Sequence, residues 1–254
     1  MNYATYFSRG QKIFLINITP GRDDSIFDAF SSTIVSCNNR QFELHPRYNL
    51  HHGDEGILSE GMLFKVTAES FGSGVQFVGK VTSVHSGSFI LEPTDQMEMY
   101  QRGQVPRTDI VTGFRSFTKT APLAFFRHEW RRFIDSIASG RTEKFDLPEI
   151  QLNLSAGGLR YVVDRSDHQT DLAMIFLDLQ DGNPPICAVA EQLWRRSLPE
   201  EEGVAIGRRF VLIKKTDQIR IQSLIDLKLK KNQKKPVPER NNWELLDRMI
   251  YNKS

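Results

Sequence analysis

The sequence predicts a mainly β protein made of two tandem small β-barrels, with one inserted helix and helices at its C-terminal end. Two observations support this fold class. Alternating and β-branched runs, separated by Gly, Ser and Asn clusters, recur through residues 12–93 and again through residues 108–213. A helical period interrupts the second series at residues 122–139. The 254 residues, of which 39% are hydrophobic and 25% charged, suffice for two modest domains.

The first domain is predicted to be a barrel that spans residues 1–94. Its clearest strands are residues 62–68, 75–81 and 88–91. Residues 95–107 lack a sustained period of either kind and contain Pro106, which predicts a linker between the domains.

The second domain is predicted to be a barrel that spans residues 108–231. Its clearest strands are residues 159–163, 172–179, 186–194 and 209–213. The helix expected at residues 122–139 has apolar side chains at helical spacing and stops at Gly140. These side chains are Leu123, Phe126, Trp130, Ile134 and Ile137. We expect Phe126 and Trp130 to face the protein's own core rather than a partner.

The C-terminal part is predicted to add helical segments. Four apolar residues suggest a helix, namely Ile219, Leu224, Ile225 and Leu227. Ile219 and Ile221 also fit a strand that continues from the barrel. The charge block at residues 228–235 predicts a solvated linker, and residues 232–254 as a whole predict a basic linker and a short helix around Trp243. That helix either docks on the barrel or binds a partner.

Charge and cysteine content narrow the function classes. A formal net charge of +2 is too small to coat a nucleic-acid polymer, so no DNA partner is expected. A small anionic ligand needs only a few arginines. Cys37 and Cys187 lie far apart and outside any Cys/His pattern, so neither a disulfide framework nor a zinc site is expected. The start of the chain lacks a charged-then-apolar leader, and no apolar run reaches about 18 residues, so we expect a cytoplasmic protein without a membrane span.

Two segments carry the candidate binding chemistry. Arg102 and Arg107 present planar forks that can bind phosphate through paired hydrogen bonds, meet a guanine edge or stack on a base. Asn153 and Ser155 alternate with Leu154, so both polar side chains share one face of a strand that enters a turn. There they can bind a base edge. Together the segments predict a phosphate-rich ligand that carries a base.

The turn continues into Gly157 and Gly158. Glycines accommodate positive φ and let a ligand approach the backbone closely. Many ordinary hairpins have the same pattern, so a purely structural turn is the alternative.

These motifs resemble those of the PilZ family, whose signature is Arg-Arg-x-x-x-Arg followed by Asp/Asn-x-Ser-x-x-Gly. The matching residues are Arg102, Arg107, Asn153, Ser155 and Gly158. Gly103 stands where the family has the middle arginine. Residues 30–93, just before the Arg segment, are similar in pattern and order to the N-terminal barrel of flagellar-brake (YcgR-type) proteins.

The resemblance implies a bacterial receptor for cyclic di-GMP that changes its inter-domain arrangement and regulates motility or biofilm behaviour through a protein partner, such as the flagellar motor at the basal body. The implied ligand-binding residues are Arg102, Arg107, Asn153, Ser155, Gly157 and Gly158, with Gln101 and Arg160 in support. No cofactor is implied beyond this ligand. The alternative is a degenerate PilZ protein that does not bind cyclic di-GMP and serves as a protein-interaction adaptor.

No catalytic constellation is expected. The His-His-Gly-Asp-Glu cluster at residues 51–55 is typical of a polar turn, because adjacent side chains on a strand point apart. Neither a Walker loop nor a Gly-x-Ser-x-Gly elbow is present. We therefore expect a protein that is not an enzyme and holds no metal.

Overall fold

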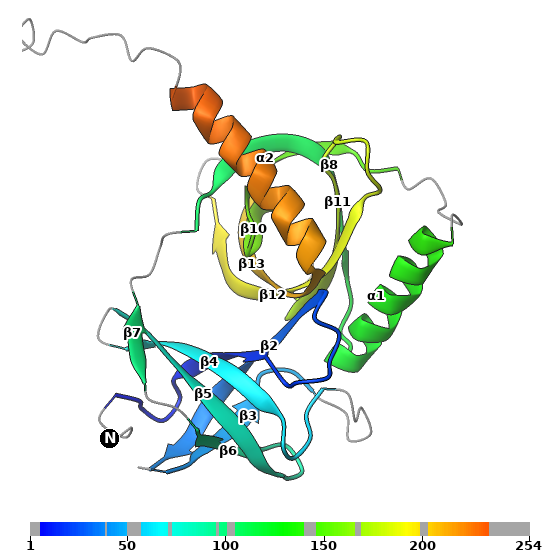
Figure 1. Ribbon diagram of the computed structural model, residues 1–254. Coiled ribbons are helices and arrows are strands. Elements are labelled where there is room, and N and C mark those ends of the chain that lie inside the picture. Colours follow the sequence, from blue (N-terminus) through cyan, green and yellow to red (C-terminus); the bar gives the residue numbers. More distant parts are fainter. Residues whose placement is uncertain are drawn as a thin grey trace, which may run out of the picture.

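The computed structural model describes residues 6–38, 40–49, 57–70, 73–94, 97–100, 105–139, 146–165, 169–198 and 203–233. Within these ranges the chain forms thirteen strands and two helices. Twelve of the strands close into two antiparallel barrels, one after the other along the chain (Figure 1). The predicted fold class, mainly β with two tandem barrels, is confirmed.

The first barrel closes through the pairing order β1-β4-β5-β6-β3-β2, with β2 returning to β1. Its strands are β1 (Lys12–Asn17), β2 (Ile26–Cys37), β3 (Phe42–Pro46), β4 (Leu63–Ser70), β5 (Ser73–Val84) and β6 (Phe89–Pro93). Alternation decides which side chains turn inward, as in β4, where Phe64, Val66 and Ala68 are buried and their neighbours are half-buried. Closure leaves no long unpaired edge in this sheet.

A seventh strand corrects the prediction for the connecting segment. Residues 95–107 were expected to lack regular structure, yet β7 (Glu98–Tyr100) lies within them and pairs with β5. Gln76 of β5 also donates a 2.9 Å hydrogen bond from Nε2 to the Glu98 carboxylate. Three residues are too short for an alternating period to be visible in the sequence.

The second barrel closes through the order β13-β10-β9-β8-β11-β12, with β12 returning to β13. Its strands are β8 (Thr108–Thr118), β9 (Glu149–Ser155), β10 (Gly158–Asp164), β11 (Leu172–Asp178), β12 (Ile186–Ser197) and β13 (Gly203–Lys214). The interior holds Leu152, Leu154 and Leu159 together with Ile175 and Ile206, all buried. Residues that alternate with these on β8, β9 and β10 form the outer face.

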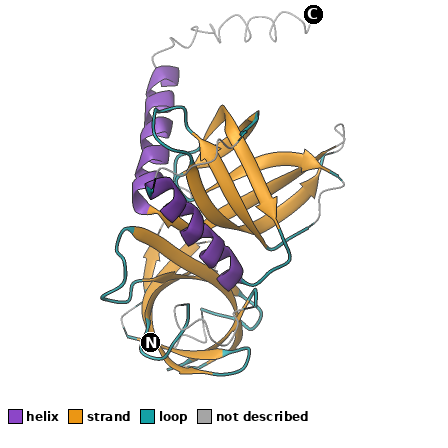
Figure 2. Ribbon diagram, turned by 90° about the vertical axis from the view of Figure 1, so that its right-hand side faces the viewer, coloured by secondary structure: helices purple, strands orange, loops and turns teal. Residues whose placement is uncertain are grey.

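The predicted helix at residues 122–139 is confirmed as α1 (Leu123–Ala138), with Pro122 at its N-cap. It lies outside the second barrel and contacts β11 and β12 (Figures 1 and 2). Phe126 and Trp130 are buried, as expected, and Trp130 Nε1 donates a 2.8 Å hydrogen bond to the carbonyl of Cys187.

The second helix, α2 (Lys215–Gln233), follows β13 directly and crosses one end of the second barrel (Figure 1). The segment around Ile219 and Ile221, for which the sequence allowed a helix or a strand, is therefore helical. Ile221 and Ile225 are fully buried in the barrel core. The linker predicted at residues 228–235 is wrong for residues 228–233, which belong to α2. Leu229 packs against the core there, and Lys is a good helix former. The predicted helix around Trp243 falls outside the described residues.

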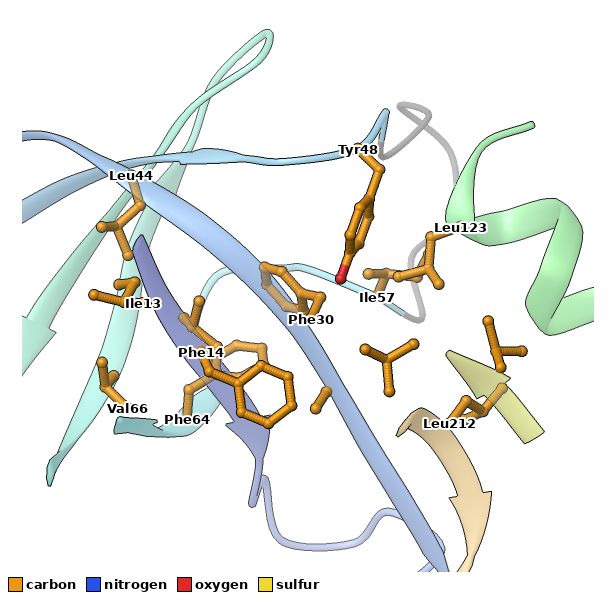
Figure 3. Close-up of a cluster of buried hydrophobic side chains, with 14 of the residues drawn as sticks. Ile13, Phe14, Phe30, Leu44, Tyr48, Ile57, Phe64, Val66, Leu123 and Leu212 are labelled. Carbon is orange, nitrogen blue, oxygen red and sulfur yellow. The ribbon is translucent and has the colours of Figure 1, made fainter. Parts of the chain in front are cut away.

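The two barrels are joined by one strand that pairs with both and by one apolar cluster that lies between them. The start of β2 leaves the first barrel to pair with the end of β13, with Asp28 opposite Leu212. One apolar cluster runs from the first barrel to α1 and to the outer face of the second barrel. Figure 3 follows this cluster from Leu44 and Val66 to Leu123 and Leu212.

Candidate functional site

Arg107 directly precedes β8, beside the turn that follows β9. The register pairs Thr108 with Leu154 and Asp109 with Asn153, so Arg107 lies one residue further toward the turn. Its side chain is exposed and makes no hydrogen bond or ion pair with another described residue. Gln101, Arg102 and Gly103 fall outside the described ranges.

Asn153 belongs to a polar row that crosses three strands on the outer face. Its Nδ2 donates a 2.9 Å hydrogen bond to Asp109 Oδ1 on β8. On the other side it pairs in register with Arg160 of β10, whose Nη2 lies 4.0 Å from the same carboxylate oxygen. Because Asp109 holds the amide nitrogen, the amide oxygen of Asn153 is the atom left to accept a hydrogen bond.

Ser155 is already used inside the protein. Its side chain is 1% exposed, and Oγ donates a 3.0 Å hydrogen bond to the carbonyl of Gly158 across the turn. The sequence predicted that this hydroxyl contacts a base edge. In the structure it braces the turn, and the hydroxyl oxygen keeps only acceptor capacity.

The two glycines of the turn differ. Neither has positive φ, so the turn does not use the left-handed backbone that glycine would accommodate. A Cβ on Gly158 would lie 2.2 Å from the carbonyl oxygen of Arg208, so this glycine does permit a close backbone approach, although to β13 of the same barrel. The carbonyl of Gly157 accepts a 2.9 Å hydrogen bond from the Phe210 amide, yet a Cβ on Gly157 would meet open space.

Trp194 extends the row and was not predicted. Arg160 pairs with Gly207 of β13, and Gly207 pairs with Trp194 of β12. The indole lies on Gly207, since a Cβ there would be 2.3 Å from its Cε2 atom, and the side chain is still 43% exposed. With strands about 4.8 Å apart, the ring lies roughly 10 Å from Asn153.

Little in the sequence could have revealed this neighbour. A glycine inside a strand, here Gly207, suggests a close approach of some group. The partner depends on the register between β12 and β13, which has a bulge between Gln192 and Trp194 that local periodicity does not show.

The turn also leads to the junction between the barrels. Gly158 pairs with Arg209 of β13, whose side chain reaches into the first barrel. Arg209 donates from Nε to Glu191 Oε1 at 2.9 Å and from Nη2 to Ser31 Oγ at 2.9 Å, with a further short contact from Nη2 to Glu191. Its guanidinium carbon lies 3.5 Å from the centre of the Phe14 ring, a cation–π contact.

The Glu191 carboxylate is fully occupied although only 1% of the residue is exposed. Besides Arg209, it accepts hydrogen bonds from Ser31 Oγ and from the Tyr48 hydroxyl, each 2.8 Å long. Burial, followed by the charge of Glu191, raises the pKa of Tyr48 well above its usual value, so Tyr48 stays a neutral donor. We call Glu191, Arg209, Ser31 and Tyr48 the junction network.

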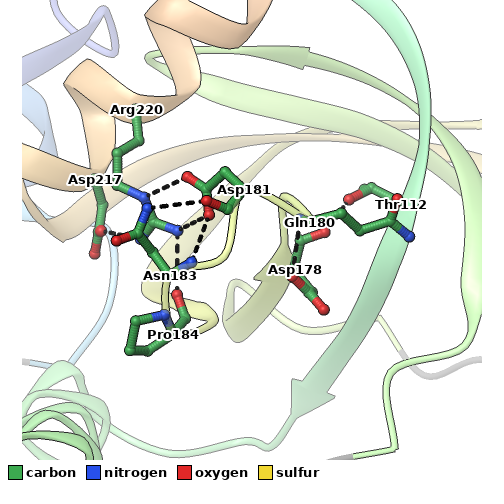
Figure 4. A network of polar contacts seen from close by, with 8 residues as sticks. All are labelled: Thr112, Asp178, Gln180, Asp181, Asn183, Pro184, Asp217 and Arg220. Carbon is green, nitrogen blue, oxygen red and sulfur yellow. Dashed lines mark hydrogen bonds and ion pairs between the residues drawn. The ribbon is translucent and has the colours of Figure 1, made fainter.

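Helix α2 is held on the second barrel by a second group of contacts, and Figure 4 shows those that Arg220 makes with Asp181 and Asp217. Gln218 donates a 3.2 Å hydrogen bond to the carbonyl of Ala156, within the turn itself. Arg220 binds both oxygens of Asp181, at 2.8 and 2.9 Å, and also binds Asp217 at 2.8 Å. The hydrogen bonds from Arg220 lower the pKa of Asp181 to about 2.

Other site classes have no support in the described part of the chain. There, no group of three His, Cys, Asp or Glu side chains could hold a metal ion. Neither described helix is long and apolar enough to cross a membrane. The cluster predicted at residues 51–55 lies outside the described residues.

No family model and no curated protein matches the chain. Several solved structures are similar to it. The Bacillus subtilis inhibitor of motility MotI/DgrA is 17% identical, covers 90% of this chain and all of its own, and gives a TM-score of 0.37. YcgR from Escherichia coli, solved in complex with c-di-GMP, is 16% identical over 88% of this chain and 86% of its own, with a TM-score of 0.33. The K. pneumonia MrkH–c-di-GMP complex is 15% identical over 89% of this chain and 90% of its own, with a TM-score of 0.31.

The sequence predicts a likeness to YcgR-type proteins, and YcgR is among these solved structures.

Proposed function

We propose that this protein is a receptor for cyclic di-GMP that binds its ligand on the outer face of the second barrel. The observation that carries the proposal is the row Asp109–Asn153–Arg160, which lies beside Arg107 and ends at the exposed ring of Trp194. Cyclic di-GMP has two phosphates and two guanines. The row and its neighbours offer cationic groups for the phosphates, a polar group for a guanine edge and a flat ring for base stacking.

Arg107 and Arg160 supply the positive charge, and each guanidinium can bind phosphate or the O6 and N7 edge of guanine. The free amide oxygen of Asn153 suits the N1 and N2 donors of a guanine. Trp194 presents a flat ring on which a base can stack, an interaction worth about 1–3 kcal/mol per base. Arg102 and Gln101 of the connecting segment complete the proposed site, and Gly157 leaves room for close approach.

The response we propose is a change in how the two barrels are arranged. A ligand on the turn 155–158 contacts a segment that is hydrogen-bonded to β13 at Arg209 and Phe210. Arg209 belongs to the junction network. A shift of the turn on ligand binding would therefore move the Arg209 side chain and change the contacts between the barrels. Ligands shift such equilibria only through different affinities for the two arrangements.

The output we propose is regulation of motility or biofilm behaviour by a cytoplasmic protein that binds a protein partner, with the flagellar motor at the basal body as the first candidate. The similar structures include an inhibitor of motility and two c-di-GMP complexes, so motility is the output to test first. Unchanged swimming of a strain without the protein, at high and low cyclic di-GMP, would argue against it.

Isothermal titration calorimetry with cyclic di-GMP tests the binding site. Arg107→Ala should weaken binding about tenfold to a hundredfold, because hydrogen bonds to charged groups contribute about 1.5–3 kcal/mol. Arg40→Ala, at an exposed arginine in the β2–β3 turn of the other barrel, is the matched control and should bind as the wild type does. Ser155→Ala should weaken binding less than Arg107→Ala, since one neutral hydrogen bond is lost rather than a charged fork.

The aromatic part of the site has its own pair of variants. Trp194→Ala should weaken binding about fivefold to a hundredfold. Phe117→Ala, at a similarly exposed aromatic residue on β8, should leave it unchanged. Equal losses in both members of a pair would mean that the row is not the site. The absence of binding heat at high ligand concentration would favour the adaptor alternative. Gly103, which stands where the family has the middle arginine, also favours that alternative.

A further inference from the structure

A cavity of about 160 Å³ lies at the junction of the two barrels, away from the row just described. Three parts of the chain line it: the loop between β1 and β2 with the start of β2, one face of α1, and the end of β13 with the start of α2. It shares no residue with the proposed cyclic di-GMP site. Its volume is several times the roughly 30 Å³ that a water molecule occupies in the liquid.

A buried ion pair forms one wall. Arg127 of α1 is 5% exposed and forms a short ion pair with Asp28 of β2. Arg22 lies 3.8 Å from the other oxygen of Asp28, so two guanidinium groups share one carboxylate. Burial raises the pKa of Asp28 and lowers that of Arg127, which indicates that the pair alone does not offset the loss of hydration.

The unsatisfied polar atoms of the wall are donors. Arg127 Nε and Asn17 Nδ2 are buried and have no hydrogen-bond partner among the described residues. Arg131 and Lys215 also line the cavity, and neither side chain forms a hydrogen bond or ion pair within the described ranges. Buried donors without acceptors are costly, and here both belong to residues that line one cavity together with two exposed cationic side chains.

The acidic residues offset only part of this charge, because four cationic and three acidic side chains line the cavity. Asp28 is held by two arginines, as described. Asp23 accepts hydrogen bonds from the amide and hydroxyl of Ser25, and these bonds lower its pKa. Asp24 is exposed, as are Arg131 and Lys215. The two buried donors have no acceptor among the described residues, and the excess positive charge of the lining favours an acceptor that carries negative charge.

We propose that this cavity is a binding site for a phosphate group, either as inorganic phosphate or as the head of a small phosphomonoester. A tetrahedral anion has enough oxygens to accept from Arg127 Nε and Asn17 Nδ2 while it meets the charges of Arg131 and Lys215. Because these residues come from β1 of the first barrel, from α1 and from the start of α2, the bound anion stabilises the two-barrel arrangement.

Inorganic phosphate is the first probe, with the full-length protein and with sodium chloride added to keep ionic strength constant. The melting temperature should rise with phosphate concentration and saturate, as mass action requires for a ligand that binds the folded state. Arg131→Ala should lower phosphate affinity at least tenfold. Arg132→Ala is the matched control, because the neighbouring side chain is 74% exposed and does not line the cavity.

Phenyl phosphate in the same assay separates the two sources of the ligand: binding tighter than that of inorganic phosphate identifies a phosphomonoester, and weaker binding identifies the free ion. Cyclic di-GMP should displace neither probe. The proposal is overturned if Arg131→Ala and Arg132→Ala respond to phosphate as the wild type does, or if chloride alone reproduces the shift. Crystals grown in phosphate that hold only ordered water in the cavity would also overturn it.

Discussion

Glu191 offers the sharpest test of how the two barrels are held together. In Glu191→Leu the carboxylate is lost, and with it the acceptor for Arg209 Nε and for the Tyr48 hydroxyl. Arg209 keeps Ser31 Oγ and the Phe14 ring as contacts. The positive charge of Arg209 is then left without its counter-ion, Glu191.

Removing one partner of a buried ion pair costs about 3–5 kcal/mol. The side chain of Arg209 is 30% exposed and can regain some hydration, whereas Glu191 is 1% exposed, so we expect the lower end of that range. For a chain of this length, about 3 kcal/mol corresponds to a melting temperature lower by roughly 6–12 °C. Adding Arg209→Met should recover much of the loss, because replacing both charges by apolar groups is often neutral.

Urea unfolding and calorimetry on the wild type, Glu191→Leu, Arg209→Met and the double variant complete the cycle. The reasoning fails if Glu191→Leu costs less than about 1 kcal/mol, or if the two single losses simply add in the double variant. Tyr48→Phe gives an independent reading, since it removes only a neutral hydroxyl and should cost about 1–3 kcal/mol.

Two further predictions concern the turn and α2. Gly158→Ala should destabilise the protein by about 1–3 kcal/mol, because the new Cβ would lie 2.2 Å from a backbone oxygen of Arg208, whereas Gly157→Ala, which meets open space, should be close to neutral in the same thermal melts. The pKa of Asp181 is lowered to about 2 by Arg220, so its contribution is complete above the unfolded value of 3.8 and is lost as pH falls through about 2. Between pH 4 and 2 the free energy of unfolding should therefore fall more in the wild type than in Asp181→Asn. The difference should be roughly 1 kcal/mol, after allowance for the screening of a one-third exposed carboxylate. If the free energy of unfolding has the same pH dependence in both proteins, Arg220 does not hold this charge.

The strands and α1 could be predicted because their signals are local. In β4 and in α1 the spacing of apolar residues alone decides which side is buried, and the structure has the same sides buried. The limits of α2 could not be predicted in this way, because a run of lysines is compatible with a solvated linker and with the end of a helix. Contact of Leu229 with the barrel core decides between them, and that contact depends on tertiary structure.

The candidate site could be predicted from the sequence only in part, for a related reason. Asn153 and Arg107 stand in short motifs, but Asp109, Arg160 and Trp194 join them only through strand register. The junction network is less visible still. Glu191 lies in a run that reads as an apolar strand, and its partner Ser31 is 160 residues away in the sequence.

One strand brings the proposed ligand face and the junction together. On β13, Gly207 supports Trp194 on the outside of the second barrel, Arg208 turns inward to donate a 3.0 Å hydrogen bond to Tyr161, and Arg209 turns out again toward the first barrel. Neighbouring side chains of a strand point to opposite faces, so Gly207 and Arg209 belong to the same outer surface. A base stacked on Trp194 would therefore lie near Gly207, which is two residues along β13 from Arg209 of the junction network. Arg208, between them, holds the inner side of the strand. Motion of β13 would break the contact to Tyr161. The change most compatible with this packing is therefore a local shift of the turn 155–158 together with a rotation of the first barrel about Arg209, while β13 keeps its place. Variants of Glu191 that loosen the junction should then alter the inter-barrel distance and leave the affinity of the isolated ligand face almost intact.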